Sequence, residues 1–124
     1  MDKLRVVLVG AAVAAGMVLP AVAAEATESA PVRAAAAYGC PDGDVCIYPG
    51  PDWNDNRPEH KYYKYGTYNV YNMYGVHRIF NNQTGGATMR TCTGKNGVGC
   101  EGYLPAGWYI DKDMTPINSI TLQP

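Results

Sequence analysis

The stretch YGTYNVYNMYGVHRIFNN, Tyr65–Asn82, decides the fold because its pattern returns later in the chain. A shift of 41 places (103 − 62) superimposes like residues on like residues. The matched pairs are Tyr62 and Tyr103, Gly66 and Gly107, Tyr68 and Tyr109, Asn72 and Asp113, Met73 and Met114, Val76 and Ile117, and Ile79 and Ile120. The repeat predicts two units of about 40 residues. A single unit of this size cannot bury an apolar face alone, so we expect both units to form one domain.

The first residues have the pattern of a secretory signal peptide. Met1–Arg5 carries the basic side chains, Val6–Leu19 is apolar, and small residues follow the helix-breaking Pro20. The apolar run is too short to span a bilayer comfortably. We therefore expect residues 1–24 to be removed on export, and the mature protein to be secreted, extracellular and outside the membrane.

The rest of the chain divides into a linker and one domain. Residues 25–37, EATESAPVRAAAA, show no strand period and contain no aromatic residue, so we expect a flexible linker or pro-segment. Residues 38–124 then form a single domain, which we expect to be monomeric. The whole chain has a formal net charge of −1, and its cations do not cluster, which argues against a nucleic-acid partner.

The four cysteines all lie in the part that we expect to be exported, where oxidation to disulfides is the rule. Four cysteines allow three pairings. We favour Cys40–Cys46 and Cys92–Cys100, because each pair closes a short loop rich in turn-forming residues and each bond would stabilise the fold by about 2–3 kcal/mol. The alternative is a four-cysteine zinc site, but its ligand pairs are normally closer in sequence than these pairs are. We therefore expect no metal there.

The spacing of turn residues predicts an all-β domain, since Gly, Pro, Asn and Asp recur at roughly strand-length intervals and no window has helical spacing. The first unit, about 40–82, should contain strands at Val45–Tyr48, Lys61–Tyr65, Tyr68–Tyr71 and Val76–Phe80. The second, about 83–124, should contain strands at Ala87–Cys92, Gly102–Leu104, Trp108–Ile110 and Ile117–Leu122. We expect the two four-stranded units to pack face to face as a Greek-key sandwich. Alternation along the strands assigns one or both tryptophans to the core together with Ile47, Tyr68, Val70, Val76, Phe80, Met89, Leu104, Tyr109, Ile117, Ile120 and Leu122.

The spacing Tyr48-x4-Trp53 before a turn, and the strand-closing sequence Asn118-Ser119-Ile120, resemble the βγ-crystallin Greek-key motif. That motif has a glycine two residues after the second aromatic, where this chain has Asp55. Asp tolerates positive φ, so the turn is retained at the cost of some strain. The resemblance implies a single βγ-crystallin-like sandwich.

The same resemblance implies where calcium would bind, just before each closing strand. The equivalent stretches are Met73–Arg78 and Met114–Ser119, and neither opens with paired carboxylate or amide residues. Arg78 also stands where the motif has a hydroxyl. Because a calcium shell needs six or more oxygens, we expect no intact site and no other cofactor. Asn81, Asn82, Asp111 and Asp113 would supply at most weak calcium binding, and they are more simply turn formers.

Within the βγ-crystallin superfamily, the export signal, the single domain and the sequence Cys40-Pro-x-Gly-x-x-Cys46 are similar to the secreted Streptomyces metalloproteinase-inhibitor family. This similarity implies a peptidase inhibitor that presents a rigid loop to an extracellular protease. The candidate protease-contact loop consists of Cys92, Thr93, Gly94, Lys95, Asn96, Gly97, Val98, Gly99 and Cys100. Its three glycines predict a supple loop, and a disulfide-closed hairpin with no partner is an equal alternative.

Two further functions stay open. The domain has more tyrosines than one small core needs, and sugar rings stack on exposed aromatic faces. This favours binding of cell-wall polysaccharide, with or without killer-toxin-like antimicrobial action. The possible sugar-stacking residues are Tyr62, Tyr63, Tyr65, Tyr71 and Tyr74. The other function is that of an extracellular structural protein with no dedicated ligand.

The residue types argue against catalysis. Ser119 is the one serine of the 38–124 domain and falls in a predicted strand, while His60 and His77 lack the spacing of a zinc-protease motif. We therefore expect no catalytic residues and a protein that is not an enzyme.

Overall fold

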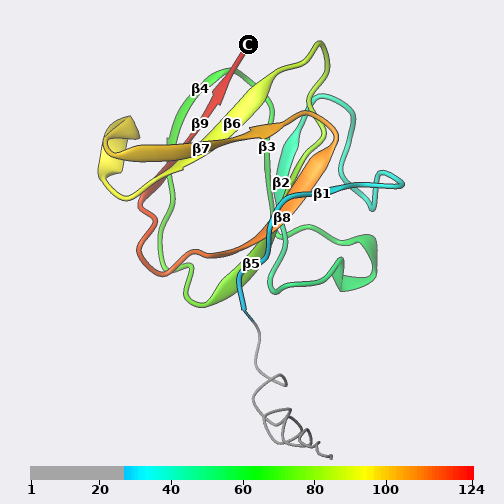
Figure 1. The fold of residues 1–124 in the computed structure, drawn as a ribbon, viewed down its shortest axis with the longest axis horizontal. Coiled ribbons are helices and arrows are strands. Elements are labelled where there is room, and N and C mark those ends of the chain that lie inside the picture. Colours follow the sequence, from blue (N-terminus) through cyan, green and yellow to red (C-terminus); the bar gives the residue numbers. More distant parts are fainter. Residues whose placement is uncertain (1–26) are drawn as a thin grey trace, which may run out of the picture.

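The computed structural model describes residues 27–124, in which nine β-strands form two antiparallel sheets (Figure 1). The predicted signal peptide lies outside the described residues. The first sheet has five strands in the order β1-β8-β5-β2-β3, and the second has four in the order β4-β9-β6-β7. The strands are β1 Val32–Arg33, β2 Val45–Ile47, β3 His60–Tyr62, β4 Gly66–Asn69, β5 Val76–Asn81, β6 Thr88–Cys92, β7 Cys100–Pro105, β8 Trp108–Asp113 and β9 Ser119–Gln123. The all-β prediction is confirmed, and each predicted strand has a counterpart within a few residues of its expected bounds.

The sequence predicts that each repeat unit forms its own sheet, but the structure differs. The two units exchange their third strands. β4, the third strand of the first unit, pairs with β9 of the second. β8, the third strand of the second unit, pairs with β5 of the first. Figure 1 shows both pairs, β4 beside β9 and β8 beside β5. In each sheet, the third strand of one unit is thus followed by the fourth, first and second strands of the other unit. Neither unit completes a sheet alone.

The apolar core lies between the two sheets and contains most of the residues that alternation assigns to it. Ile47, Val70, Phe80, Met89, Leu104, Ile117, Ile120 and Leu122 are buried. The half-buried exceptions are Tyr68, Val76 and Tyr109, together with both tryptophans. Tyr68 reaches the surface because its hydroxyl donates to the carbonyl of Lys64 at 2.6 Å. Val45, Tyr48, Ile79 and Met114, which alternation does not assign, are fully buried.

A separate aromatic cluster anchors the long turn between β2 and β3. The Tyr38 ring stacks on Trp53 with centroids 3.8 Å apart, and Tyr48 and Phe80 meet Trp53 edge-on at 5.2 and 5.6 Å. The Tyr48 hydroxyl donates to the carbonyl of Tyr38 at 2.7 Å. This cluster ties the turn to β5 and to the start of the domain.

Arg78 also contacts the long turn between β2 and β3. Its guanidinium lies 4.7 Å from the Trp53 ring and 4.4 Å from the Tyr109 ring. It donates two hydrogen bonds to Asp111, at 2.7 and 3.0 Å, and one to the carbonyl of Pro51 at 3.0 Å. Arg78 therefore ties this turn to β8.

Part of the segment that the sequence predicts to be a flexible linker forms a strand instead. Val32 and Arg33 of β1 pair with β8. The amide of Ser29 donates to the carbonyl of Asp111 at 3.0 Å, and the amide of Ala34 donates to the carbonyl of Gly107 at 2.9 Å. The free edge of β8 offers a row of hydrogen-bonding groups, and pairing with it fixes a segment whose composition alone does not favour structure.

The turn after Trp53 contains three successive non-glycine residues with positive φ, namely Asn54 at 48°, Asp55 at 54° and Asn56 at 61°. Asp55 occupies the position where the motif has glycine, and its side chain is 88% exposed. Positive φ costs an L-residue about 1–2 kcal/mol, and somewhat less for Asn and Asp. We predict that Asp55→Gly leaves the free energy of unfolding unchanged or raises it by up to about 1 kcal/mol, whereas Asp55→Ala lowers it by about 1 kcal/mol. Urea unfolding of both variants checks this, and a larger loss for Gly than for Ala would contradict it.

Burial raises the pKa of the Tyr48 hydroxyl to about 12, although the positive charge of Arg78 acts in the opposite direction. The pKa in the unfolded chain is about 10. The protonated hydroxyl therefore contributes its full stabilisation below pH 10 and loses it as the pH rises through about 12. We predict that the free energy of unfolding falls by at most about 2–3 kcal/mol over this window, and clearly less in Tyr48→Phe. Urea unfolding of both proteins at several pH values measures the difference, and equal slopes would refute the assignment to Tyr48.

Candidate functional site

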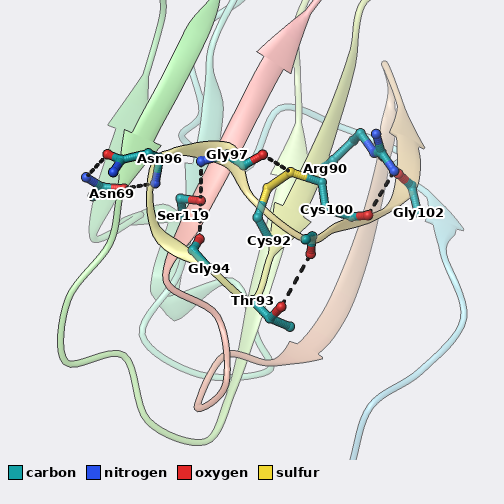
Figure 2. The surroundings of a disulfide bond; sticks show 11 residues. Asn69, Arg90, Cys92, Thr93, Gly94, Asn96, Gly97, Cys100, Gly102 and Ser119 are labelled. Atoms are coloured by element: carbon teal, nitrogen blue, oxygen red, sulfur yellow. Dashed lines mark hydrogen bonds between the residues drawn. A yellow bond between two sulfur atoms is a disulfide. The ribbon is translucent and has the colours of Figure 1, made fainter.

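The four cysteines pair as Cys40–Cys46 and Cys92–Cys100, the pairing that the sequence analysis favours. Cys92 ends β6 and Cys100 begins β7, so the second bond closes the hairpin between these strands. Thr93–Gly99, here called the 93–99 loop, protrudes beyond this bond (Figure 2). Two disulfides are typical of proteins in an oxidising, extracellular setting.

Ser119 at the start of β9 holds the 93–99 loop. Its hydroxyl is fully buried, donates to the carbonyl of Gly94 at 2.6 Å and accepts from the amide of Gly97 at 3.0 Å. Figure 2 shows the Ser119 side chain between Gly97 and Gly94, on the inner side of the loop. The sequence predicts a strand at Ser119 but does not predict these bonds to the loop, for which the strand-closing sequence Asn118-Ser119-Ile120 is the available signal.

Asn69 on β4 holds the far side of the loop. Its side-chain oxygen accepts from the amide of Asn96 at 2.8 Å, and its side-chain nitrogen donates to the side-chain oxygen of Asn96 at 3.0 Å. Asn96 has φ of 59°, so these bonds offset an unfavourable backbone conformation. Gly97 lies so close to the sheet that a Cβ on it would meet Thr67 at 3.2 Å. The loop is therefore folded back onto β4 and β9.

The prediction of a supple loop does not hold, because most of the loop's backbone amides and carbonyls are hydrogen-bonded. The amides of Thr93 and Gly94 donate to the carbonyls of Gly99 and Val98, at 3.0 and 2.8 Å. The side chain of Asn118 donates to the carbonyl of Thr93 at 2.8 Å. The glycines thus permit a tight turn rather than provide flexibility.

The exposed tip of the loop presents two different side chains. Val98 is 64% exposed, which is unusual for an aliphatic residue in a small domain. Lys95 is exposed, and its ammonium lies 5.6 Å from the centre of the Tyr71 ring. A cation over an aromatic ring is weakly attracted to it, so Tyr71 favours one direction for the Lys95 side chain.

The 93–99 loop has a counterpart in the first unit. The short 3-10 turns Asn54–Asn56 and Lys95–Gly97 are 41 places apart (95 − 54), and so are Arg78 and Ser119 (119 − 78). Both turns have a positive-φ residue at their centre, Asp55 and Asn96. Arg78 contacts the segment before the first turn, through Pro51 and the Trp53 ring, whereas Ser119 bonds the second turn directly, through Gly94 and Gly97.

Side-chain nitrogens face the carbonyl oxygens near the two stretches where the resemblance implies calcium. The ring of His77 lies between the carbonyls of Tyr48 and Tyr74, at 2.7 Å from Nδ1 and 3.2 Å from Nε2. Asn118 donates to the carbonyls of Thr93 and Pro116, at 2.8 and 3.4 Å. The carbonyls of Thr93 and Pro116 thus have a donor within the protein, and the tautomer of the His77 ring decides which of its two carbonyls accepts.

The four residues considered for weak calcium binding do not converge either. Asn81 is buried and bonds the carbonyls of Ala87 and Leu104, and Asn82 bonds the carbonyl of Cys40. Asp111 is paired with Arg78. Asp113 accepts from the amide of Thr115, a bond that lowers its pKa. Among residues 27–124, no group of three or more His, Cys, Asp or Glu side chains could hold a metal ion.

We predict that calcium barely changes the thermal stability. A site with a dissociation constant of about 10 mM would add only about 0.06 kcal/mol at about 1 mM calcium. Thermal unfolding with about 1 mM calcium or with a chelator measures this, with magnesium as the control for ionic strength. A rise of several degrees that is specific to calcium would contradict the prediction.

The five tyrosines considered for sugar stacking do not form one surface. Tyr62 is half-buried against Tyr68, with centroids 4.9 Å apart. The other four are exposed and line two different hollows, one with Tyr63 and Tyr65 and the other with Tyr71 and Tyr74. Tyr103 is also exposed, under the guanidinium of Arg90 at 4.2 Å, and the sequence analysis does not include it.

Comparisons with known proteins identify no relative, since no family model, curated protein or solved structure matches this chain. No helix among residues 27–124 is long and apolar enough to cross a membrane.

Proposed function

We propose that the protein is a secreted inhibitor that presents the 93–99 loop to the cleft of an extracellular protease. The observation that carries the proposal is the pinned backbone of this loop. A disulfide closes its base, Ser119 bonds its centre and Asn69 bonds its far side. A loop fixed before binding loses little conformational entropy when it enters a cleft, so more of the contact energy becomes affinity.

The exposed tip supports a mode of binding through side chains. The amide and carbonyl of Val98 are bonded within the loop, to Lys95 and Gly94. Gly97 and Gly99 on either side have φ of 78° and 70°. A protease therefore finds no extended strand to pair with, and the contact falls to Lys95 or Val98. Lys95 suits a serine protease of trypsin-like preference, and Val98 suits a zinc endopeptidase that prefers an apolar residue.

We also propose that the sandwich is of the βγ-crystallin Greek-key type. The exchange of β4 and β8 between the sheets, and the positive φ of Asp55 at the motif's glycine position, support this assignment. In this proposal the protein has no catalytic residues, because Ser119 is used to hold the loop. The resemblance to secreted inhibitors agrees with the two disulfides.

The test is an inhibition constant for the oxidised secreted protein against trypsin-like serine proteases and thermolysin-like zinc endopeptidases. We predict that the Cys92→Ala and Cys100→Ala double variant raises the constant at least tenfold, since each released backbone residue costs roughly 1–2 kcal/mol to order. Ser119→Ala should act in the same direction without altering the tip. Lys95→Ala should raise the constant at least tenfold for a serine protease, and Val98→Ala for a zinc endopeptidase.

Lys61→Ala is the matched control, because it removes an exposed lysine from β3, outside the loop. Circular dichroism confirms that each variant keeps its sheets. Failure of the parent protein to inhibit any protease of the panel at about 10 μM would refute the proposal. So would unchanged inhibition by both tip variants, and the loop would then be only a closed hairpin.

A further inference from the structure

Three turns enclose a hollow of about 450 Å³ that the proposed inhibitor function does not use. Its walls come from the loop inside the first disulfide, from the turn between β3 and β4, and from the turn after β5. The lining residues are Asp42, Gly43, Tyr63, Lys64, Tyr65, Gln83 and Thr84. A hollow of this size is within the range that small-molecule ligands occupy.

Two exposed tyrosines form its aromatic wall. Tyr63 is 67% and Tyr65 is 56% exposed. The Tyr63 ring packs closely over Gly43, since a Cβ at Gly43 would lie only 2.9 Å from the ring carbon Cε1. Gly43 also has φ of 96°, a conformation that side chains disfavour. The close approach therefore requires glycine and holds the ring against the backbone while most of its surface stays open.

The three turns are fixed before any ligand binds. The Cys40–Cys46 bond closes the loop that contains Asp42 and Gly43, and Asn82 bonds that loop through its side chain to the carbonyl of Cys40 at 2.8 Å. The amide of Gly43 donates to the carbonyl of Asn82 at 2.8 Å. The Tyr68 hydroxyl donates to the carbonyl of Lys64, between the two tyrosines. Such preorganisation lowers the entropic cost of binding.

Gln83 forms a fixed wall of the hollow. Its side chain is 93% buried (100 − 7), and its nitrogen donates to the side chain of Asn81 and to the carbonyl of Thr88, both at 3.1 Å. These two acceptors fix the orientation of the amide, and its oxygen Oε1 then has no partner in the protein. Because Oε1 is itself enclosed, Gln83 serves as a fixed wall of the hollow and not as an acceptor for a ligand.

The charges of the hollow favour a neutral ligand. Asp42 and Lys64 carry one charge of each sign, and Thr84 adds a hydroxyl. The Asp42 carboxylate is oriented by the side chain of Asn82 at 3.3 Å. Aromatic rings beside carboxylate, amide and hydroxyl groups suit a molecule with apolar C–H faces and a rim of hydroxyls.

We propose that this hollow binds a neutral β-1,4-linked hexose chain. The equatorial hydroxyls of such a chain leave both ring faces flat and apolar, so one sugar residue can stack on Tyr63 or Tyr65. Its hydroxyls then lie near the carboxylate of Asp42 and the hydroxyl of Thr84. Glucose and N-acetylglucosamine chains share this chemistry. The site is separate from the 93–99 loop, so binding of sugar and inhibition of a protease are independent activities.

The experiment titrates the secreted oxidised protein with cellohexaose and with chitohexaose, by calorimetry and by NMR chemical shifts. We expect binding of at least one of them, weakened at least tenfold in Tyr63→Ala and retained within about threefold in Tyr63→Phe. Tyr74→Ala is the matched control, since Tyr74 is 71% exposed but lines a different hollow, and its affinity should equal that of the parent. Gly43→Ala, which displaces the Tyr63 ring, should weaken binding in the same way as Tyr63→Ala.

Stronger binding of cellohexaose or of chitohexaose identifies which of the two sugars the site takes. Absence of binding to both at about 5 mM would overturn the proposal, as would equal losses in Tyr63→Ala and Tyr74→Ala. Thermal unfolding verifies that Tyr63→Ala and Gly43→Ala are folded. If Gly43→Ala does not fold, the comparison of Tyr63→Ala with Tyr63→Phe still tests the proposal. Inhibition by Tyr63→Ala should equal that of the parent, so the two activities succeed or fail separately.

Discussion

The pairing of β4 with β9, and of β8 with β5, is the constraint on which the rest of the structure depends. Each sheet contains one strand from the other half of the chain, so both sheets are built from both repeat units. This arrangement sets Asn69 beside the 93–99 loop, because Asn69 belongs to the first unit but ends a strand of the second unit's sheet. It also places Asp111 beside Arg78. The Asp111 carboxylate pairs with the guanidinium of Arg78 and so stabilises this cation among aromatic rings.

The two halves share one backbone arrangement but stabilise it with different side chains. In both, the turn between the first and second strands folds back over its sheet and passes through a residue with positive φ. The first half fills the space beneath this turn with Trp53, Tyr38 and Arg78, which makes the turn part of an aromatic cluster. The second half uses a small hydroxyl at Ser119, so the turn lies flat on the sheet and its side chains stay outside. The same turn of the repeat is therefore stabilised by aromatic packing in the first half and by hydrogen bonds in the second.

Much of this fold could be predicted, because strand positions follow from turn residues and from alternation, both of which are local. The strands from Val45 to Gln123 and the local cysteine pairs are of this kind. The exchange of the third strands could not be predicted, since alternation shows which face of a strand is buried but not which sheet the strand joins. The strand at Val32–Arg33 was missed for a related reason: its composition is neutral, and only the open edge of β8 fixes it.

The candidate site was predictable in position but not in character. The cysteine spacing locates the 93–99 loop, while its three glycines predict flexibility that the hydrogen bonds of Ser119 and Asn69 remove. These bonds join residues more than twenty places apart, beyond the reach of any local pattern. The tyrosines show the same limit, because their number indicates surface aromatics, whereas the position of Tyr63 depends on its contact with Gly43.

The exchanged strands also bear on how the molecule is made. Contacts between distant parts of a chain form slowly, because a long loop must close before they contribute any stability. The first unit emerges first during synthesis but has no sheet to complete until β8 has followed it. The strand that pairs with β4 and the second neighbour of β5 are therefore missing until most of the chain is present. Oxidation of the short cysteine loops then needs no distant partner and can precede the closing of the sandwich.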